Sequence, residues 1–128
     1  MLSLVAVSQP ATLQATTLSV IATWLLFAAF LSLTAFIAAR NLLGDVSLSP
    51  HAIVGPPVAA IAFLVATFEF SPLLGLLAAL AVDAVAFRYI HGLNRRLLAG
   101  VVVIHFTVSV ILGAILFSLI ALIGSAPV

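Results

Sequence analysis

Hydrophobic residues fill four long stretches of the chain, and short segments containing Gly, Asn, Ser or Pro separate them. Each stretch has about 20 residues or more, which is enough for an α-helix to cross a ~30 Å hydrocarbon layer. The stretches leave room for short connections only, because the whole chain has 128 residues. The pattern predicts an all-α polytopic membrane protein, with four transmembrane helices in an up-down bundle. The expected helices are 17–43, 50–70, 72–91 and 95–124.

Typical helix-end residues mark these boundaries. Gly44 follows the first stretch and suits the left-handed conformation of a helix C-terminus. Ser49-Pro50 and Ser71-Pro72 each offer an N-cap followed by a proline, which is tolerated at the first helical position. Gly92-Leu93-Asn94 turns the chain into the fourth helix.

The composition supports a single membrane domain, 1–128. Apolar residues make up 66% of the chain and charged residues 5%, far below the roughly 25% of soluble domains. The uncharged runs are 39 residues at the start, 23 in the middle and 32 at the end. The absence of cysteine excludes disulfides and thiolate metal sites, and four arginines without lysine are too few for a nucleic-acid surface. We therefore expect the lipid bilayer, and no nucleic acid, as a partner.

The charges also predict the orientation of the helices. Four crossings place Arg40, Arg88, Arg95 and Arg96 on one side of the membrane and Glu69 on the other. By the positive-inside rule, both arginine-bearing connections face the cytoplasm. The expected localisation is the cell membrane, multi-pass, with both termini outside.

Gly55-Pro56-Pro57 interrupts the second helix. The two prolines lack amide donors and disfavour helical geometry at the preceding residues. An α-helix that started only at Pro56 would be about 22 Å long, short for a bilayer. We therefore expect a kinked helix from Pro50.

The most informative polar residues are Asp83 in the third helix and His105 in the fourth. If the hairpin reverses around Asn94, residues equidistant from it lie level, which pairs Asp83 with His105. The same register pairs small residues at four-residue spacing, which membrane helices use for close contact. The further pairs are Ala79 with Ser109 and Gly75 with Gly113. This register predicts that the third and fourth helices form the tightest hairpin.

An aspartate within a membrane span costs about 2.5 to 3.5 kcal/mol, so we expect it to be paired or protonated. The imidazole of His105 relieves that cost either as a donor to the carboxylate or as an acceptor from the protonated carboxyl. One interpretation is a polar clasp that fixes the hairpin. The other is a proton-relay or ion-coupling site, with Arg88 as the charge that keeps Asp83 ionised.

The remaining polar residues point to no catalysis. His105 is expected about 12 Å deeper than His51 and His91, too far for one shared metal ion. Ser32 and Thr34 are expected to bond the carbonyls of their own helix. No nucleophile elbow, HExxH or phosphate-binding glycine loop occurs, so we expect neither an enzyme nor a cofactor.

Three segments carry a family resemblance: Ala39 to Val46, Val54-Gly55-Pro56-Pro57, and Val82-Asp83-Ala84. Together they resemble small four-span membrane proteins of unassigned function from halophilic archaea. The resemblance implies a membrane protein and no particular activity.

These observations favour a non-catalytic accessory or assembly subunit of a membrane complex or homo-oligomer. The small residues Ala28, Ser32, Ala35 and Ala39 form a stripe on the first helix that suits packing inside the protein or against a partner. The alternative is a small proton or ion conductor that uses Asp83 and His105.

Overall fold

The structure, a computed structural model, describes the backbone of residues 2–127 and the side chains of residues 16–127. Four helices in this part of the chain are long and apolar enough to cross a membrane, and no strand occurs in it. The predicted all-α, four-span fold class is thus confirmed. The elements are α1 (Leu2–Leu43), the short 3-10 helix η1 (Ser49–Ile53), α2 (Gly55–Phe68), α3 (Pro72–His91) and α4 (Arg95–Gly124).

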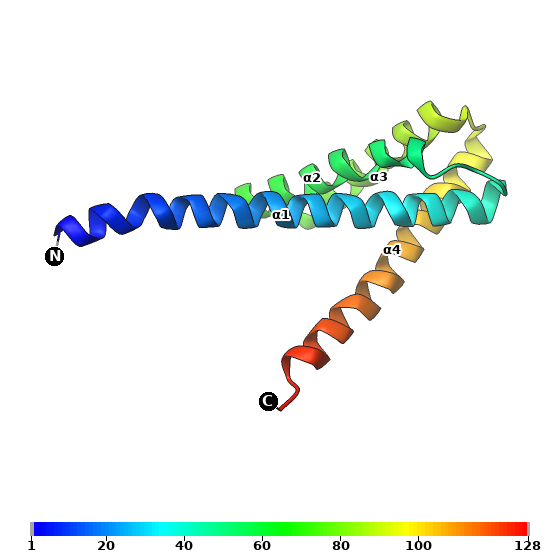
Figure 1. Cartoon of the computed structure of the whole chain (residues 1–128). Coiled ribbons are helices and arrows are strands. Elements are labelled where there is room, and N and C mark those ends of the chain that lie inside the picture. Colours follow the sequence, from blue (N-terminus) through cyan, green and yellow to red (C-terminus); the bar gives the residue numbers. More distant parts are fainter. Residues whose placement is uncertain (1, 128) are drawn as a thin grey trace.

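The helices run up and down, but they do not form a uniform bundle (Figure 1). α2 and α3 extend along α1, and both termini lie toward the end opposite the α1–η1 and α3–α4 connections. α4 begins against α1 and α3 and then diverges from them toward its C-terminus. α4 has 30 residues, about 45 Å of rise, which is more than a ~30 Å layer requires.

The predicted end signals set the helix boundaries at the connections. Gly44 (φ 89°) and Gly92 (φ 59°) adopt the left-handed conformation, and the Gly92 amide donates to the Arg88 carbonyl oxygen at 2.8 Å. The Asn94 side chain caps α4 by accepting a hydrogen bond from the Leu97 amide at 2.9 Å. This short connection holds α3 and α4 antiparallel at their arginine-bearing end.

The prediction of an α-helix that begins at Pro50 is wrong for the first turns of this segment. Residues Ser49–Ile53 form η1, and α2 starts at Gly55, so that Pro56 and Pro57 lie in its first turn. First-turn amides have no partner within their own helix, and the missing donors of the prolines cost nothing there. An α-helix running through from Pro50 would have lost two of its bonds at these prolines. η1 and α2 together still provide a span-length segment, Ser49–Phe68.

The most extensive helix contact is between α1 and α2, and the contact between α3 and α4 is smaller, so the prediction that α3 and α4 form the tightest hairpin is wrong. A Cβ atom at Gly55 would lie 1.9 Å from the Ala28 carbonyl oxygen, so only glycine permits this approach. The Gly55 amide donates to Ser32 Oγ at 3.0 Å. Ala28, Ala35 and Ala39 are buried, so the small-residue stripe of α1 packs inside the protein.

The predicted pairing of Gly75 on α3 with Gly113 on α4 is wrong. A Cβ atom at Gly75 would meet Val65 of α2, and one at Gly113 would approach Phe30 of α1 at 3.8 Å. Gly75 and Gly113 therefore do not pack against each other. Both glycines line a cavity to which all four α-helices contribute.

Candidate functional site

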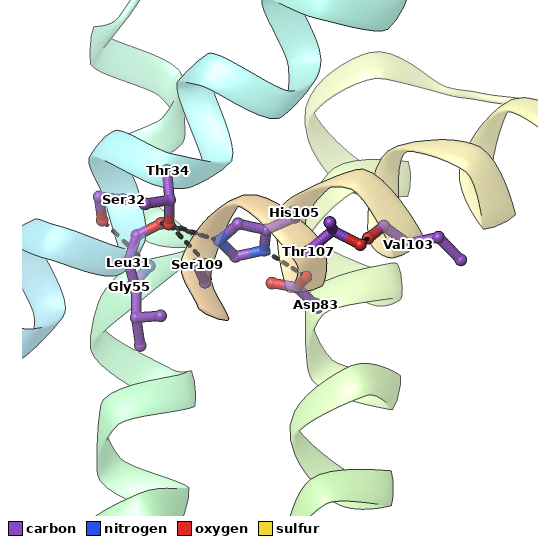
Figure 2. Close-up of polar contacts among 9 residues, drawn as sticks. All are labelled: Leu31, Ser32, Thr34, Gly55, Asp83, Val103, His105, Thr107 and Ser109. Atoms are coloured by element: carbon purple, nitrogen blue, oxygen red, sulfur yellow. Dashed lines mark hydrogen bonds and ion pairs between the residues drawn. The ribbon is translucent and has the colours of Figure 1, made fainter. Parts of the chain in front are cut away.

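Asp83 and His105 meet in the interior of the protein, as the register around Asn94 predicts. Asp83 Oδ2 and His105 Nδ1 are 2.5 Å apart (Figure 2). The two residues are 4% and 3% exposed. Within the part of the chain that the structure describes, Asp83 and His105 form the one ion pair. Burial on this scale in an apolar chain requires that each group has a partner.

α1 supplies the other side of the site. His105 Nε2 lies 3.0 Å from the Leu31 carbonyl oxygen and 3.0 Å from Thr34 Oγ1. Ser109, one turn further along α4, places its hydroxyl 2.9 Å from Thr34 Oγ1. We call Asp83, His105, Thr34, Ser109 and the Leu31 carbonyl the polar cluster. It joins α1, α3 and α4 (Figure 2).

The contacts around His105 determine which ring nitrogen carries a proton. The Leu31 carbonyl oxygen only accepts, so Nε2 must be an N–H group. The Thr34 hydroxyl donates to the same carbonyl at 3.0 Å, which leaves Thr34 Oγ1 as an acceptor. With Nε2 protonated, the contact between Nδ1 and Asp83 Oδ2 contains a single proton, which resides on one atom or the other. The pair is neutral overall in both states, which lowers the cost of its place in a membrane.

One atom of the polar cluster has no partner. Asp83 Oδ1 is buried and makes no hydrogen bond within the described residues. Asp83 also lines the cavity between the helices, together with His105 and Ser109. The cluster therefore contains one buried acceptor that no group of the described residues uses.

Arg88 is not the charge partner of Asp83. Its side chain is exposed, and no ion pair joins it to Asp83. Five residues along an α-helix correspond to a rotation of about 140° from the starting direction, so Arg88 leaves the helix on another face. Among the side chains that the structure describes, His105 is the hydrogen-bond partner of Asp83.

Two other histidines form a second polar contact, which the sequence did not indicate. His51 Nε2 and His91 Nε2 are 2.9 Å apart, and His51 Nδ1 lies 2.8 Å from the Ser47 carbonyl oxygen. That carbonyl requires a proton on His51 Nδ1, so neutral His51 accepts at Nε2 from His91. The fully buried ring of Phe87 contacts both His51 and His105, with ring centroids 6.2 and 5.6 Å apart. The histidine pair and the polar cluster are thus separated by an apolar ring.

The described residues contain no group of three or more His, Cys, Asp or Glu side chains that could hold a metal ion. His105 is committed to α1 and to Asp83, away from the histidine pair.

Sequence reasoning missed the roles of Thr34 and Ser32. Thr34 does bond the carbonyl of its own helix, as expected, but it also accepts from the polar cluster. The Ser32 hydroxyl instead lies 3.4 Å from the Ala52 carbonyl oxygen of η1, so the expectation of a bond within its own helix is wrong. Both residues lie on the face of α1 that carries the buried alanines, and that shared face was the available signal.

A model of a family of unknown function, DUF7473, matches residues 14–127. No curated protein and no solved structure matches the chain.

Proposed function

We propose that this chain, which belongs to the DUF7473 family of unknown function, is a non-catalytic accessory or assembly subunit of a membrane complex or homo-oligomer. The observation that carries this proposal is the outer half of α4. Every residue from 114 to 127 is exposed, and this part of the helix stands apart from α1, α2 and α3 (Figure 1). A membrane helix with no neighbour in its own chain offers a whole surface to another protein.

The polar cluster supports a structural role. It ties α4 to α1 and α3 at one level, close to the point where α4 begins to diverge. A hydrogen-bonded contact of this kind fixes both the level and the rotation of a helix that has few other internal contacts. The cluster would thereby hold the outer half of α4 in a defined direction for a partner.

The test uses single cysteines, because the chain has none of its own. Ser118→Cys lies in the outer half of α4, and Val85→Cys, on the exposed face of α3, is the matched control. In native membranes we expect a cross-linked species with Ser118→Cys and little or none with Val85→Cys. The proposal fails if neither position cross-links and gentle detergent extraction yields only monomer.

Orientation is part of the same proposal. We place both termini outside, with the arginine-bearing connections in the cytoplasm. Ser125→Cys should react with a membrane-impermeant maleimide in intact cells, and Ser47→Cys only after permeabilisation. The reverse labelling pattern would invert the topology.

The alternative function is a small proton or ion conductor. It is favoured by the single proton between Asp83 Oδ2 and His105 Nδ1, and by the histidine pair on the other side of Phe87. Asp83→Asn is the decisive variant. Its amide donates to His105 Nδ1 and keeps the contact, but it removes the transferable proton. If the protein is a conductor, wild type passes protons across liposome membranes and Asp83→Asn does not. If it is an assembly subunit, neither form leaks more than empty liposomes.

A further inference from the structure

His51 and His91 meet at the arginine-bearing end of the protein, with one ring nitrogen of each facing the other. His51 lies in η1, and His91 lies in the last turn of α3. Their Nε2 atoms are 2.9 Å apart, and their ring centroids are 5.0 Å apart. The rings therefore meet through their nitrogen atoms and do not stack. A neutral imidazole nitrogen is the commonest metal ligand in proteins.

The surroundings of His51 hold its ring in the form that a metal ligand needs. Its Nδ1 lies 2.8 Å from the Ser47 carbonyl oxygen, which only accepts, so in the neutral ring Nδ1 carries the proton and Nε2 keeps a lone pair. Histidines that bind metals typically have their second nitrogen bonded in this way. The ring also contacts Phe36 and Phe87, at centroid distances of 5.8 and 6.2 Å. The lone pair of His51 is thus directed toward His91.

His91 connects the pair to an open hollow. Its ring is half-buried and lines a space of about 750 Å³, together with Asp45, Ser47 and Tyr89. Neutral His91 has one ring proton, which it donates from Nε2 to His51. When that proton is on Nδ1 instead, Nε2 of His91 also offers a lone pair, and a turn of the ring toward the hollow leaves room for an ion between the two nitrogens. The Asp45 carboxylate adds a negative charge beside this entrance.

The spacing of the two Nε2 atoms selects the geometry of the ion. Metal–imidazole bonds are about 2.0–2.1 Å long. Two such bonds to atoms 2.9 Å apart enclose an angle of about 90°, as neighbouring ligands do in square-planar or octahedral ions. A tetrahedral ion would need nitrogens roughly 3.3–3.4 Å apart. Imidazole in square-planar or tetragonal geometry is typical of Cu²⁺ and Ni²⁺.

We infer that His51 and His91 bind a Cu²⁺ or Ni²⁺ ion through their Nε2 atoms, with water from the hollow as the further ligands. The ion replaces the hydrogen bond between the two rings and links η1 to α3. His105 takes no part, since its two ring nitrogens contact Asp83 and α1. The inference does not rest on the assembly role, because the pair lies at the end of the molecule opposite the C-terminal end of α4 (Figure 1).

The experiment measures Ni²⁺ binding by isothermal titration calorimetry on the untagged protein in phosphatidylcholine nanodiscs. Wild type is expected to bind one ion per chain. His91→Gln is the test variant, because its amide still donates to His51 Nε2 but is a poor ligand for these ions. It should weaken binding about tenfold or more, since even the outer partners of metal ligands contribute roughly 10- to 100-fold to affinity. Tyr89→Gln, at a neighbouring position that is 83% exposed, is the matched control and should bind as wild type does.

Pulsed EPR of bound Cu²⁺ counts the imidazole ligands directly. Wild type should show two coordinated imidazoles and His91→Gln at most one, although His51 and His105 both remain in that variant.

Three results would overturn the proposal: a single imidazole in wild type, Ni²⁺ binding no greater than that of empty nanodiscs, or equal Ni²⁺ affinity in wild type and His91→Gln. If His91→Gln fails to fold, the EPR of wild type decides alone. The cross-linking of Ser118→Cys is a separate readout, so the failure of one proposal leaves the other intact.

Discussion

Replacing Asp83 by leucine tests how much the polar cluster contributes to holding the helices together. Leucine is similar in size, but it leaves His105 Nδ1 buried without a partner. Hydrogen bonds to charged groups contribute about 1.5–3 kcal/mol in soluble proteins. Contacts between membrane helices average about 0.6 and reach about 1.7 kcal/mol, since separated helices find other partners in the bilayer.

We expect a loss of about 1–2 kcal/mol for Asp83→Leu, because the contact lies at the upper end of the membrane range. The hydrogen bond between Asp83 and His105 is short, and the two residues are 4% and 3% exposed. The other nitrogen of the imidazole is bonded to the Leu31 carbonyl oxygen of α1. Such a loss lowers the ratio of folded to unfolded protein by about 5 to 30 fold. Asp83→Asn should cost less than about 0.5 kcal/mol, since an amide N–H replaces the shared proton.

The assay is reversible unfolding by SDS in mixed micelles, followed through the fluorescence of Trp24, the single tryptophan. Trp24 packs against the α1–α2 core, so its emission reports loss of tertiary structure. Val85→Leu, 70% exposed on the same helix, is the control and should match wild type. Two results would refute the reasoning: a stability of Asp83→Leu equal to that of wild type, or a loss in Asp83→Asn as large as in Asp83→Leu.

Three further predictions use the same protein. Gly55→Ala should lose about 1–3 kcal/mol in the SDS assay, because its Cβ would overlap a carbonyl oxygen of α1, whereas Gly124→Ala should be neutral; equal stability of the two variants would contradict the close contact. Thr34→Val should lose about 1 kcal/mol, and the exposed Thr107→Val, whose hydroxyl bonds only its own helix, should lose much less; the opposite order would remove Thr34 from the cluster. Nitrogen-15 NMR of histidine-labelled protein should show a proton on Nε2 of His105, assigned by its absence in His105→Asn, and a bare Nε2 would invalidate the single shared proton.

The sequence by itself determined the spans, their order and one contact between them. Runs of uncharged residues longer than the bilayer requires leave no other fold class for the chain. The pairing of Asp83 with His105 also followed, because a short connection around Asn94 fixes the relative level of two antiparallel helices. The predicted role of Arg88 as a charge partner was wrong, although five residues of helical rotation already turn Arg88 away from Asp83.

The tertiary structure alone decided what surrounds this pair. Thr34 and the Leu31 carbonyl are more than 70 residues from His105, and no short connection sets the level of α1 against α4. The pairing of His51 with His91 also joins residues that are distant in the sequence. It depends on the position of η1, which carries His51 and precedes the prolines in the first turn of α2. The tilt of α4, and with it the cavity, depends on how an entire helix packs against its neighbours. Spacing along one chain specifies the rotation and level of residues within a helix and across a tight turn, but not the angle between helices that only packing brings together.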